Sequence, residues 1–310
     1  MKQKIICVVG PTASGKTRLG VELCKAIDGE VVSADSMQIY RDMHIASAAP
    51  DQSEMQGIPH HLVEFLPYGS HFTVADYVKT AREKIDGILS RGKTPVIVGG
   101  TGLYINSLVN NVEFIDTETD FKLRESITAE FETVGGAEML NRLRQLDPDT
   151  AAKLHENDKR RIIRAFEIYK STGHTKSFND KQSLMNDSPY KACTIGITYR
   201  DRELLYDRIN KRVDIMLTNG LLEEAKTAFL KKLGGGAIQA IGHKEFFDYF
   251  KGEITLDEAI ENLKRSTRRY AKRQLTWFNK SDKINWIYAD DTDNVVAKAI
   301  ETAERNENYA

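Results

Sequence analysis

The sequence predicts an α/β protein with a parallel sheet core and a helical domain inserted into it. In the first third of the chain, short apolar runs alternate with amphipathic segments, which is typical of strands joined by crossover helices. Between residues 120 and 173, helical periodicity replaces this alternation, and a strand-like run resumes at 192–199. We therefore expect a core of residues 1–113 and 191–310, and a helical insertion of residues 114–190.

The first strand, residues 5–9, leads into a glycine-rich loop. The run Gly10-Pro11-Thr12-Ala13-Ser14-Gly15-Lys16-Thr17 matches GxxxxGK[ST] and opens an amphipathic segment that ends near residue 27. In this context, backbone N–H groups and the helix N-terminus bind phosphate, Lys16 reaches the terminal phosphate and the Thr17 hydroxyl binds Mg²⁺. An incidental glycine turn would not explain why all fixed positions and both flanks agree. The sequence therefore predicts a P-loop NTPase-like, kinase-like core that binds a di- or triphosphate.

The next two strands, 31–35 and 95–99, each end in candidate functional residues. Because ligands bind beyond the carboxyl ends of parallel strands, both ends should lie near the glycine loop. Asp35 could hold magnesium or accept a proton, whereas a helix N-cap is the structural alternative. Thr101 is the one functional side chain in the run Gly99-Gly100-Thr101-Gly102, for which a plain glycine turn is the alternative. The amide of Gln38 would suit an adenine edge.

Helices are predicted for most of the remaining chain. Thr73 and Asp76 form a capping pattern for a helix that continues to Leu89. A polar segment without periodicity is expected at 177–188. The other expected helices are 121–131, 137–146, 149–155, 158–172, 201–218, 220–232 and 256–278, and a last strand is expected at 284–288.

Composition narrows the class of protein. The net charge of −1 provides no global attraction to nucleic acid, so any such binding needs a local patch. Cys7, Cys24 and Cys193 lie singly in apolar runs, which predicts buried thiols in a reducing cytoplasm. The chain begins directly with a strand and has no apolar run of about 20 residues, so we expect neither a signal peptide nor a membrane span. The pair His60-His61 is interpreted as structural, because neighbouring strand residues point to opposite faces.

A local basic patch is predicted at residues 264–280, which contain seven basic residues and no acidic one. On a helix, six of these cations spread over about half of the surface, while Tyr270 and Trp277 lie on much of the other half. A solvated face usually mixes charges, so this one-signed face favours a polyanion. The insertion has a second cluster, Lys159-Arg160-Arg161 with Arg164. Arg202 and Arg208 could clamp phosphate, although their spacing does not place them on one helical line and a solvated face is the alternative.

Seven motifs in this order resemble the bacterial tRNA dimethylallyltransferase family: GPTASGKT, ADSMQIYR, IPHHL, VGGTGLY, NDKRRIIRAFEIY, AIGHK and TRRYAKRQLTWF. They extend from the glycine loop to Trp277. The resemblance implies a P-loop kinase-like core with a helical insertion. It further implies transfer of a dimethylallyl group from dimethylallyl pyrophosphate to N6 of adenosine 37, in the anticodon stem-loop of tRNA, with release of pyrophosphate and with Mg²⁺ as cofactor.

The resemblance also implies roles for individual residues. The loop from Gly10 to Thr17 would hold the pyrophosphate, and Lys16, Arg202 and Arg208 would neutralise its charge. Asp35 would be the base for the N6 proton and Thr101 a catalytic contact to the reacting groups. The adenosine would leave its stack to enter the site. The implied tRNA-binding residues are Asp35, Ser36, Met37, Gln38, Thr101, Arg124, Arg160, Arg161, Arg164, Gln239, His243, Lys244, Arg269, Lys272, Arg273 and Trp277. We expect a cytoplasmic monomer without an obligate protein partner.

Three other functions stay open at this point. An adenylate isopentenyltransferase would modify a free nucleotide, which needs neither the insertion nor the basic helix. An ATP-dependent small-molecule kinase would turn over ATP without a prenyl donor. A non-catalytic RNA-binding protein would leave Asp35 and Thr101 beside a phosphate loop unexplained.

Overall fold

The computed structural model describes residues 2–114, 120–183, 186–231 and 240–308. The chain divides into two compact units. The first comprises Met1–Val109 and Pro189–Ala310, and the second comprises Asn110–Ser188, close to the predicted insertion of 114–190.

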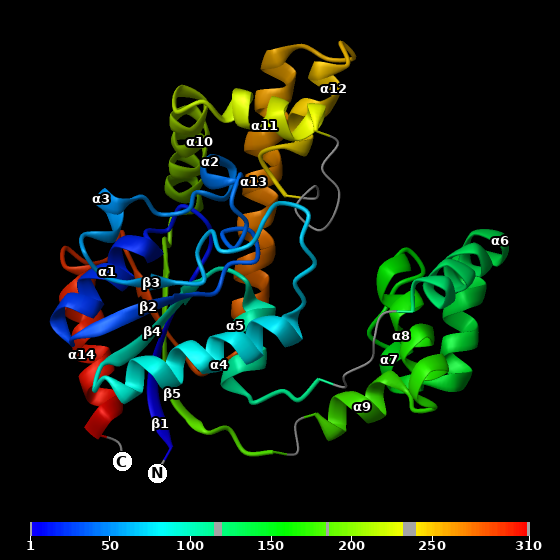
Figure 1. Cartoon of the computed structure of the whole chain (residues 1–310), viewed down its shortest axis with the longest axis horizontal. Helices are drawn as coiled ribbons and strands as arrows, with labels where there is room; N and C mark the ends of the chain where they lie inside the picture. The colour runs from blue at the N-terminus through cyan, green and yellow to red at the C-terminus, as the bar shows by residue number, and fades with distance from the viewer. Residues whose placement is uncertain (1, 115–119, 184–185, 232–239, 309–310) are drawn as a thin grey trace. The chain divides into compact units, whose positions relative to one another are not determined.

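The first unit is built on a six-stranded sheet with the strand order β3-β2-β4-β1-β5-β6 (Figure 1). All neighbouring strands pair in parallel. The strands are β1 (Gln3–Val9), β2 (Gly29–Ser33), β3 (His60–His61), β4 (Thr94–Gly99), β5 (Tyr190–Thr198) and β6 (Ile284–Tyr288). The central strands are buried along nearly their whole length, as expected when helices cover both faces of a parallel sheet. The predicted α/β class with a parallel sheet is confirmed.

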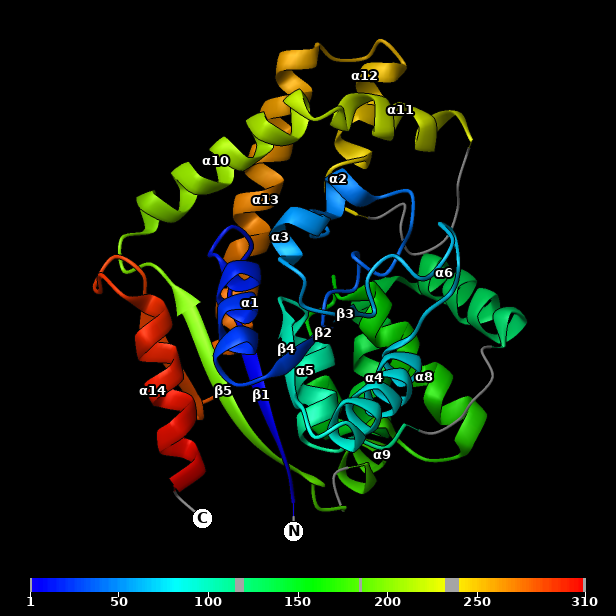
Figure 2. The same cartoon turned by 60° about the vertical axis from the view of Figure 1, so that its left-hand side comes forward.

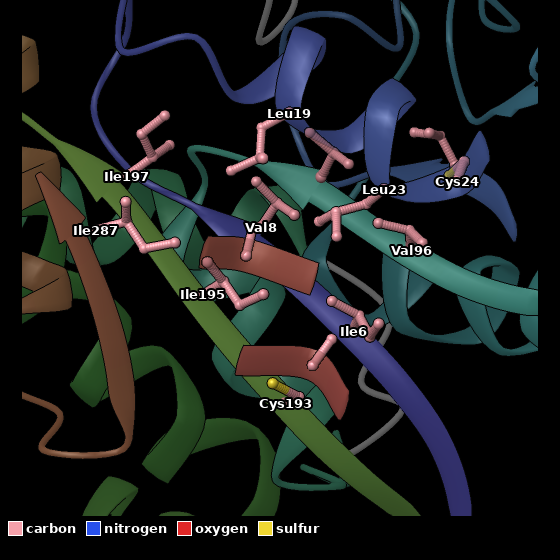
Figure 3. Packing of buried hydrophobic residues seen from close by; sticks show 14 residues of the cluster. Ile6, Val8, Leu19, Leu23, Cys24, Val96, Cys193, Ile195, Ile197 and Ile287 are labelled. Atoms are coloured by element: carbon pink, nitrogen blue, oxygen red, sulfur yellow. The ribbon is translucent and has the colours of Figure 1, made fainter. Parts of the chain in front are cut away.

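Helices cover both faces of this sheet. On one face, α1 (Lys16–Ala26) and α14 (Val295–Asn308) pack against β1 and β5 (Figure 2). Ile6 and Val8 point into this layer beside Leu19 and Ile195 (Figure 3). Cys7 lies between them on the strand and points to the other face. There α4 (Val74–Ser90) and α5 (Gly102–Val109) pack against β4.

The first unit also carries a small helical subcore of its own. It joins α10 (Arg202–Thr218), α11 (Leu221–Leu230), the 3-10 turn η2 (Lys244–Phe246), α12 (Phe247–Phe250) and α13 (Leu256–Phe278). Val213, Phe246 and Leu263 are buried at its centre. Helix α13 starts in this subcore at the capping box of Thr255 and Glu258 and runs alongside α10 (Figure 1). The last turns of α13 therefore reach the α/β core, where α13 contacts α5.

The second unit is helical in its described part. Its helices are α6 (Phe121–Leu146), α7 (Pro148–Ala151), α8 (Lys159–Thr172) and α9 (Lys176–Gln182). The predicted helices 121–131 and 137–146 join in α6 across Gly135, whose φ of 82° interrupts the helical geometry. Helix α9 forms where no regular structure was predicted. It is too short to show a period, and the hydroxyl of Thr175 caps it by accepting from Phe178 N.

Five other short or amphipathic helices were not predicted, and the four-residue α12 is one of them. Helices α2 (His44–Ser47) and α3 (Gln52–Met55) span four residues each, too few for a periodic signal. Helix α5 reads as an apolar run, and α14 buries the small side chains Ala299 and Ala303 against the sheet. The predicted capping box of Thr73 and Asp76 at α4 is confirmed.

Two expectations from composition can be compared with the structure. All three cysteines are buried free thiols, as predicted. Within the described ranges, none of the helices combines the length and the apolar character needed to cross a membrane.

Candidate active site

The glycine loop connects the end of β1 to the start of α1. Gly10 has a φ of 151°, and a Cβ on it would lie 2.3 Å from the carbonyl oxygen of Ile197. Gly15, with a φ of 97°, is the N-cap of α1 and provides no side-chain cap, so the first N–H groups of the helix stay available to an anion. The buried hydroxyl of Ser14 has no hydrogen-bond partner among the described residues. Phosphate oxygens would satisfy these donors.

Lys16 lies inside this loop, where its Nζ donates to the carbonyl oxygen of Pro11 at 2.6 Å. Burial lowers the pKa of Lys16 to about 7, and repulsion from Arg212 adds to this effect, whereas the charge of Asp35 opposes it. A nearby anion stabilises the protonated form of a lysine. A bound phosphate would therefore raise the pKa of Lys16 again and favour its charged form.

Two arginines of α10 also reach the loop. Arg208 Nε donates to the carbonyl oxygen of Ala13 at 3.0 Å, and Arg212 Nη1 donates to Thr12 Oγ1 at 3.3 Å. The two arginines are four residues apart, which places them on one face of the helix. Sequence reasoning missed Arg212, although its spacing from Arg208 was a usable signal. Arg202, the first residue of α10, makes no hydrogen bond or ion pair with a described residue, so these contacts bring Arg212 rather than Arg202 to the loop beside Arg208.

Asp35 and Thr101 follow the adjacent strands β2 and β4. Thr101 N donates to the carbonyl oxygen of Ala34 at 3.1 Å, and Thr101 Oγ1 accepts from Ser36 N at 3.0 Å. The absence of a side chain at Gly99 permits this approach, because a Cβ there would lie 2.1 Å from the oxygen of Ala34. Two hydrogen bonds therefore connect the segment after β2, which carries Asp35, to the turn after β4, which carries Thr101.

The carboxylate of Asp35 is fixed on one side. Its Oδ1 accepts from Met37 N at 2.9 Å and from Gln38 N at 3.4 Å, whereas no described residue donates to Oδ2. The negative charge of Asp35 acts to raise the pKa of both Lys16 and Arg212, so the carboxylate lies within electrostatic range of the two cations. One carboxylate oxygen thus orients the group, and the other is available to a reacting atom.

Gln38 supports the loop that follows β2. Its Oε1 accepts from Ser33 Oγ at 3.1 Å, and its Nε2 donates to the carbonyl oxygen of Ala48 at 3.0 Å. Both ends of the amide are therefore engaged within the chain, and a predicted adenine contact would have to share or replace these bonds.

A magnesium ion would fit this loop through the Thr17 hydroxyl. Thr17 lies in the first turn of α1, next to Lys16 and half-buried. The described residues contain no group of three or more His, Cys, Asp or Glu side chains that could hold a metal by themselves. Mg²⁺ commonly takes one or two protein oxygens together with phosphate oxygens and water, and the Thr17 hydroxyl would be such a protein oxygen.

Five of the six basic residues of α13 form two groups, and the sixth, Arg265, is exposed and bonds to Asn262 of the same helix. Lys264 pairs with Asp214 at 2.7 Å and Arg268 Nη1 donates to Asn210 Oδ1 at 2.6 Å, so both bind α10. The other group, Arg269, Lys272 and Arg273, is exposed. The predicted one-signed face is therefore partly a packing surface. Trp277 is 39% exposed and covers Gly102, where a Cβ would lie 2.1 Å from the indole Cδ1.

In the second unit, two of the predicted tRNA-binding arginines bind a buried carboxylate. Arg124 donates twice to Glu167, with both N–O distances at 3.0 Å, and Arg164 Nη1 donates to it at 2.9 Å. Burial raises the pKa of Glu167, but the two arginines outweigh burial and lower it overall. Removal of either arginine would leave a buried charge poorly compensated. Arg160 and Arg161 are exposed on α8.

His243 does not lie on a surface. It is fully buried, its Nε2 is 2.8 Å from Glu224 Oε1, and it stacks on Tyr68. In this arrangement the His243 side chain presents no surface to tRNA, and its predicted contact with tRNA stays a prediction. Lys244 is exposed beside it, and Gln239 lies outside the described residues.

The pair His60-His61 has the structural role that was predicted. His61 Nε2 lies 2.8 Å from Glu30 Oε2, and His60 Nδ1 lies 2.9 Å from the carbonyl oxygen of Ile58. Both rings are therefore engaged within the chain.

With this geometry established, comparison with known proteins identifies the family. A family model described as IPP transferase matches residues 38–281, and one described as Isopentenyl transferase matches residues 3–64. A tRNA dimethylallyltransferase of Thermoanaerobacter sp. is 48% identical and covers 95% of this chain and 94% of its own. This chain belongs to the tRNA dimethylallyltransferase (IPP transferase) family. A tRNA dimethylallyltransferase of Halalkalibacterium halodurans is 44% identical and covers 94% of this chain and 93% of its own.

Solved structures of the family agree with the fold. The full-length tRNA isopentenylpyrophosphate transferase of Bacillus halodurans has a TM-score of 0.73 and 40% identity, with 99% of each chain covered. A eukaryotic dimethylallyltransferase acting on tRNA has a TM-score of 0.82 and 30% identity, with 96% of this chain and 78% of that chain covered. These matches confirm the P-loop NTPase-like fold and the resemblance seen in the motifs.

Proposed function

We propose that this protein transfers a dimethylallyl group to N6 of adenosine 37 of tRNA, and that the donor is dimethylallyl pyrophosphate. The observation that carries the proposal is the meeting of Lys16, Arg208 and Arg212 at the glycine loop, in front of the Asp35 carboxylate. This arrangement places three cations that can bind the pyrophosphate leaving group near a carboxylate that can accept a proton from the attacking N6 amine.

On the donor side, the chain stabilises departing charge. As the bond between C1 of the dimethylallyl group and oxygen breaks, the electron pair leaves with pyrophosphate. The open N–H groups of α1, the Ser14 hydroxyl and the three cations oppose this charge inside a partly buried loop. Magnesium, held by Thr17 and by pyrophosphate oxygens, would neutralise part of the same charge.

On the acceptor side, Asp35 receives the proton. The N6 lone pair of adenine forms the new bond to carbon, and the N6 proton passes to Asp35 Oδ2, the carboxylate oxygen to which no described residue donates. Thr101, fixed by Ser36 N, lies beside this carboxylate as a catalytic contact to the reacting groups. The adenosine has to leave its stack to reach Asp35.

For the RNA acceptor, the exposed cations supply the contacts. We propose that Arg269, Lys272 and Arg273 of α13 bind phosphates of the anticodon stem-loop, and that Trp277 offers a stacking surface. Arg160 and Arg161 of α8 provide further phosphate contacts from the second unit. The protein acts as a monomer in the cytoplasm, without an obligate protein partner.

A direct assay tests the proposal. The protein is incubated with dimethylallyl pyrophosphate, magnesium and either unmodified tRNA or AMP, and the nucleosides are identified by mass spectrometry. We expect dimethylallyl adenosine at the position beside the anticodon and no reaction of AMP. Modified AMP would reveal an adenylate isopentenyltransferase, and ATP turnover without the prenyl donor would reveal a kinase.

A further inference from the structure

Three side chains on one face of α13 contact the site: Tyr270, Gln274 and Trp277. They are four and three residues apart, the spacing of neighbours on a helical surface. Gln274 Oε1 accepts from Thr12 N at 2.8 Å, and Gln274 Nε2 donates to the carbonyl oxygen of Gly100 at 3.0 Å. One amide thus connects the glycine loop after β1 to the turn after β4.

The surroundings of Gln274 are shaped to receive this amide. Its side chain is 5% exposed, and a Cβ on Gly100 would lie 2.1 Å from its Nε2. The hydroxyl of Tyr270 interacts with both Gln274 and Thr101. The amide of Gln274 provides an uncharged acceptor and an uncharged donor on two separate atoms, and the side chain of asparagine, the other amide, is one methylene shorter.

We propose that Gln274 is a positioning residue of the transfer reaction. It fixes the loop that holds the leaving group relative to the turn that carries Thr101, and it ties both to the helix that bears Arg269, Lys272 and Arg273. This inference rests on the proposed function, because it assigns the pyrophosphate to the glycine loop. Transfer requires the reacting atoms to be held about 3–3.5 Å apart, and a displacement of about 1 Å can cost about a hundredfold in rate.

The first test is Gln274→Met, which keeps the length of the side chain and removes both hydrogen bonds. We expect the affinity for inorganic pyrophosphate, measured by calorimetry, to fall about tenfold and kcat to fall about ten- to a hundredfold. The Kd for an anticodon stem-loop RNA should not change, since the exposed cations of α13 remain. The matched control is Thr276→Val, because the Thr276 hydroxyl bonds only within α13, to the carbonyl oxygen of Lys272.

The second variant, Gln274→Glu, tests the geometry of the amide by its pH profile. A charged glutamate can accept from Thr12 N but cannot donate to Gly100, whereas a protonated one can do both. Because burial at this position raises the pKa of a carboxyl above its usual value of about 4.3, pyrophosphate affinity and kcat, each relative to wild type at the same pH, should recover as the pH falls from about 7 to about 5. A residue that only stabilises the fold would not restore these two quantities on protonation.

The outcomes separate this inference from the proposed function. If wild type does not bind pyrophosphate, the donor site is wrong and the positioning role fails with it. If wild type binds pyrophosphate and transfers the dimethylallyl group, but the two Gln274 variants keep wild-type affinity and kcat per folded molecule, only the positioning role is overturned. A lowered melting temperature without a change in pyrophosphate affinity or kcat would also overturn the positioning role, because Gln274 would then only stabilise the fold.

Discussion

Neutralising the exposed cations of α13 should weaken RNA binding in a salt-dependent way. The variant replaces Arg269, Lys272 and Arg273 with glutamine and leaves Tyr270 and Trp277 against the core. Each cation that neutralises a phosphate releases counterions, and its loss lowers the slope of log K against log salt by about 0.7 to 0.9. Three lost contacts would lower the slope by roughly two units.

The structure provides a matched control on the same helix. Lys264 and Arg268 have the same charges but bind Asp214 and Asn210 of α10. Their replacement with glutamine should lower the melting temperature and leave the salt slope close to wild type. The control removes two positive charges and the triple variant removes three, so a slope that changes only in the triple variant separates phosphate contacts from helix packing.

The assay is fluorescence anisotropy with an anticodon stem-loop RNA across a range of salt concentrations. Circular dichroism establishes that each variant is folded, and calorimetry with inorganic pyrophosphate checks the donor site, which should be unaffected. An unchanged slope in the folded triple variant would refute the assignment of these cations to RNA. A control that changes the slope as much as the triple variant does would refute the division of the helix into two groups.

Further predictions concern the two loops and the subcore. Lys16→Met should weaken pyrophosphate binding in calorimetry and slow transfer while RNA affinity persists, and transfer at the wild-type rate would contradict the phosphate role of the loop. Asp35→Asn should lower kcat by about 10²–10⁴ with both substrates still bound; loss of RNA affinity with kcat intact would instead assign Asp35 to positioning. For Glu224, burial raises the pKa, but bonds to His243 and to backbone N–H groups lower it overall. This carboxylate therefore stabilises the fold above its unfolded pKa of about 4.3 and less as the pH falls through the lower folded value. Thermal unfolding of Glu224→Gln should show a loss of about 1–3 kcal/mol at neutral pH that narrows in acid, and an equal loss at every pH would contradict this.

Local patterns in the sequence determined the framework of the first unit. The β-branched run before Gly10 and the amphipathic segment after Lys16 predict a strand and a helix joined by a tight turn, and both elements are present. The capping box at Thr73 depends on residues three apart, and it formed as predicted. These features were predictable because the groups that decide them are neighbours in the chain.

Only the tertiary structure decided which charged and polar groups serve the site. Periodicity placed the cations of α13 on a common face. Arg268 nevertheless donates to Asn210, 58 residues earlier in the chain, and so binds α10. The resemblance implied that His243 binds tRNA, yet its ring is buried beside Glu224 and Tyr68. A helical period tells which side chains share a face and says nothing about what lies opposite that face.

The bond between Thr12 and Gln274 spans 262 residues of sequence. No local rule links a glycine loop at one end of the chain to a glutamine in a helix near the other, and the same holds for Arg212 and Thr12. The sequence determined the phosphate loop and the carboxylate by itself, because their chemistry lies in adjacent residues at strand ends. The packing of α10 and α13 against that edge of the sheet determined which side chains complete the site.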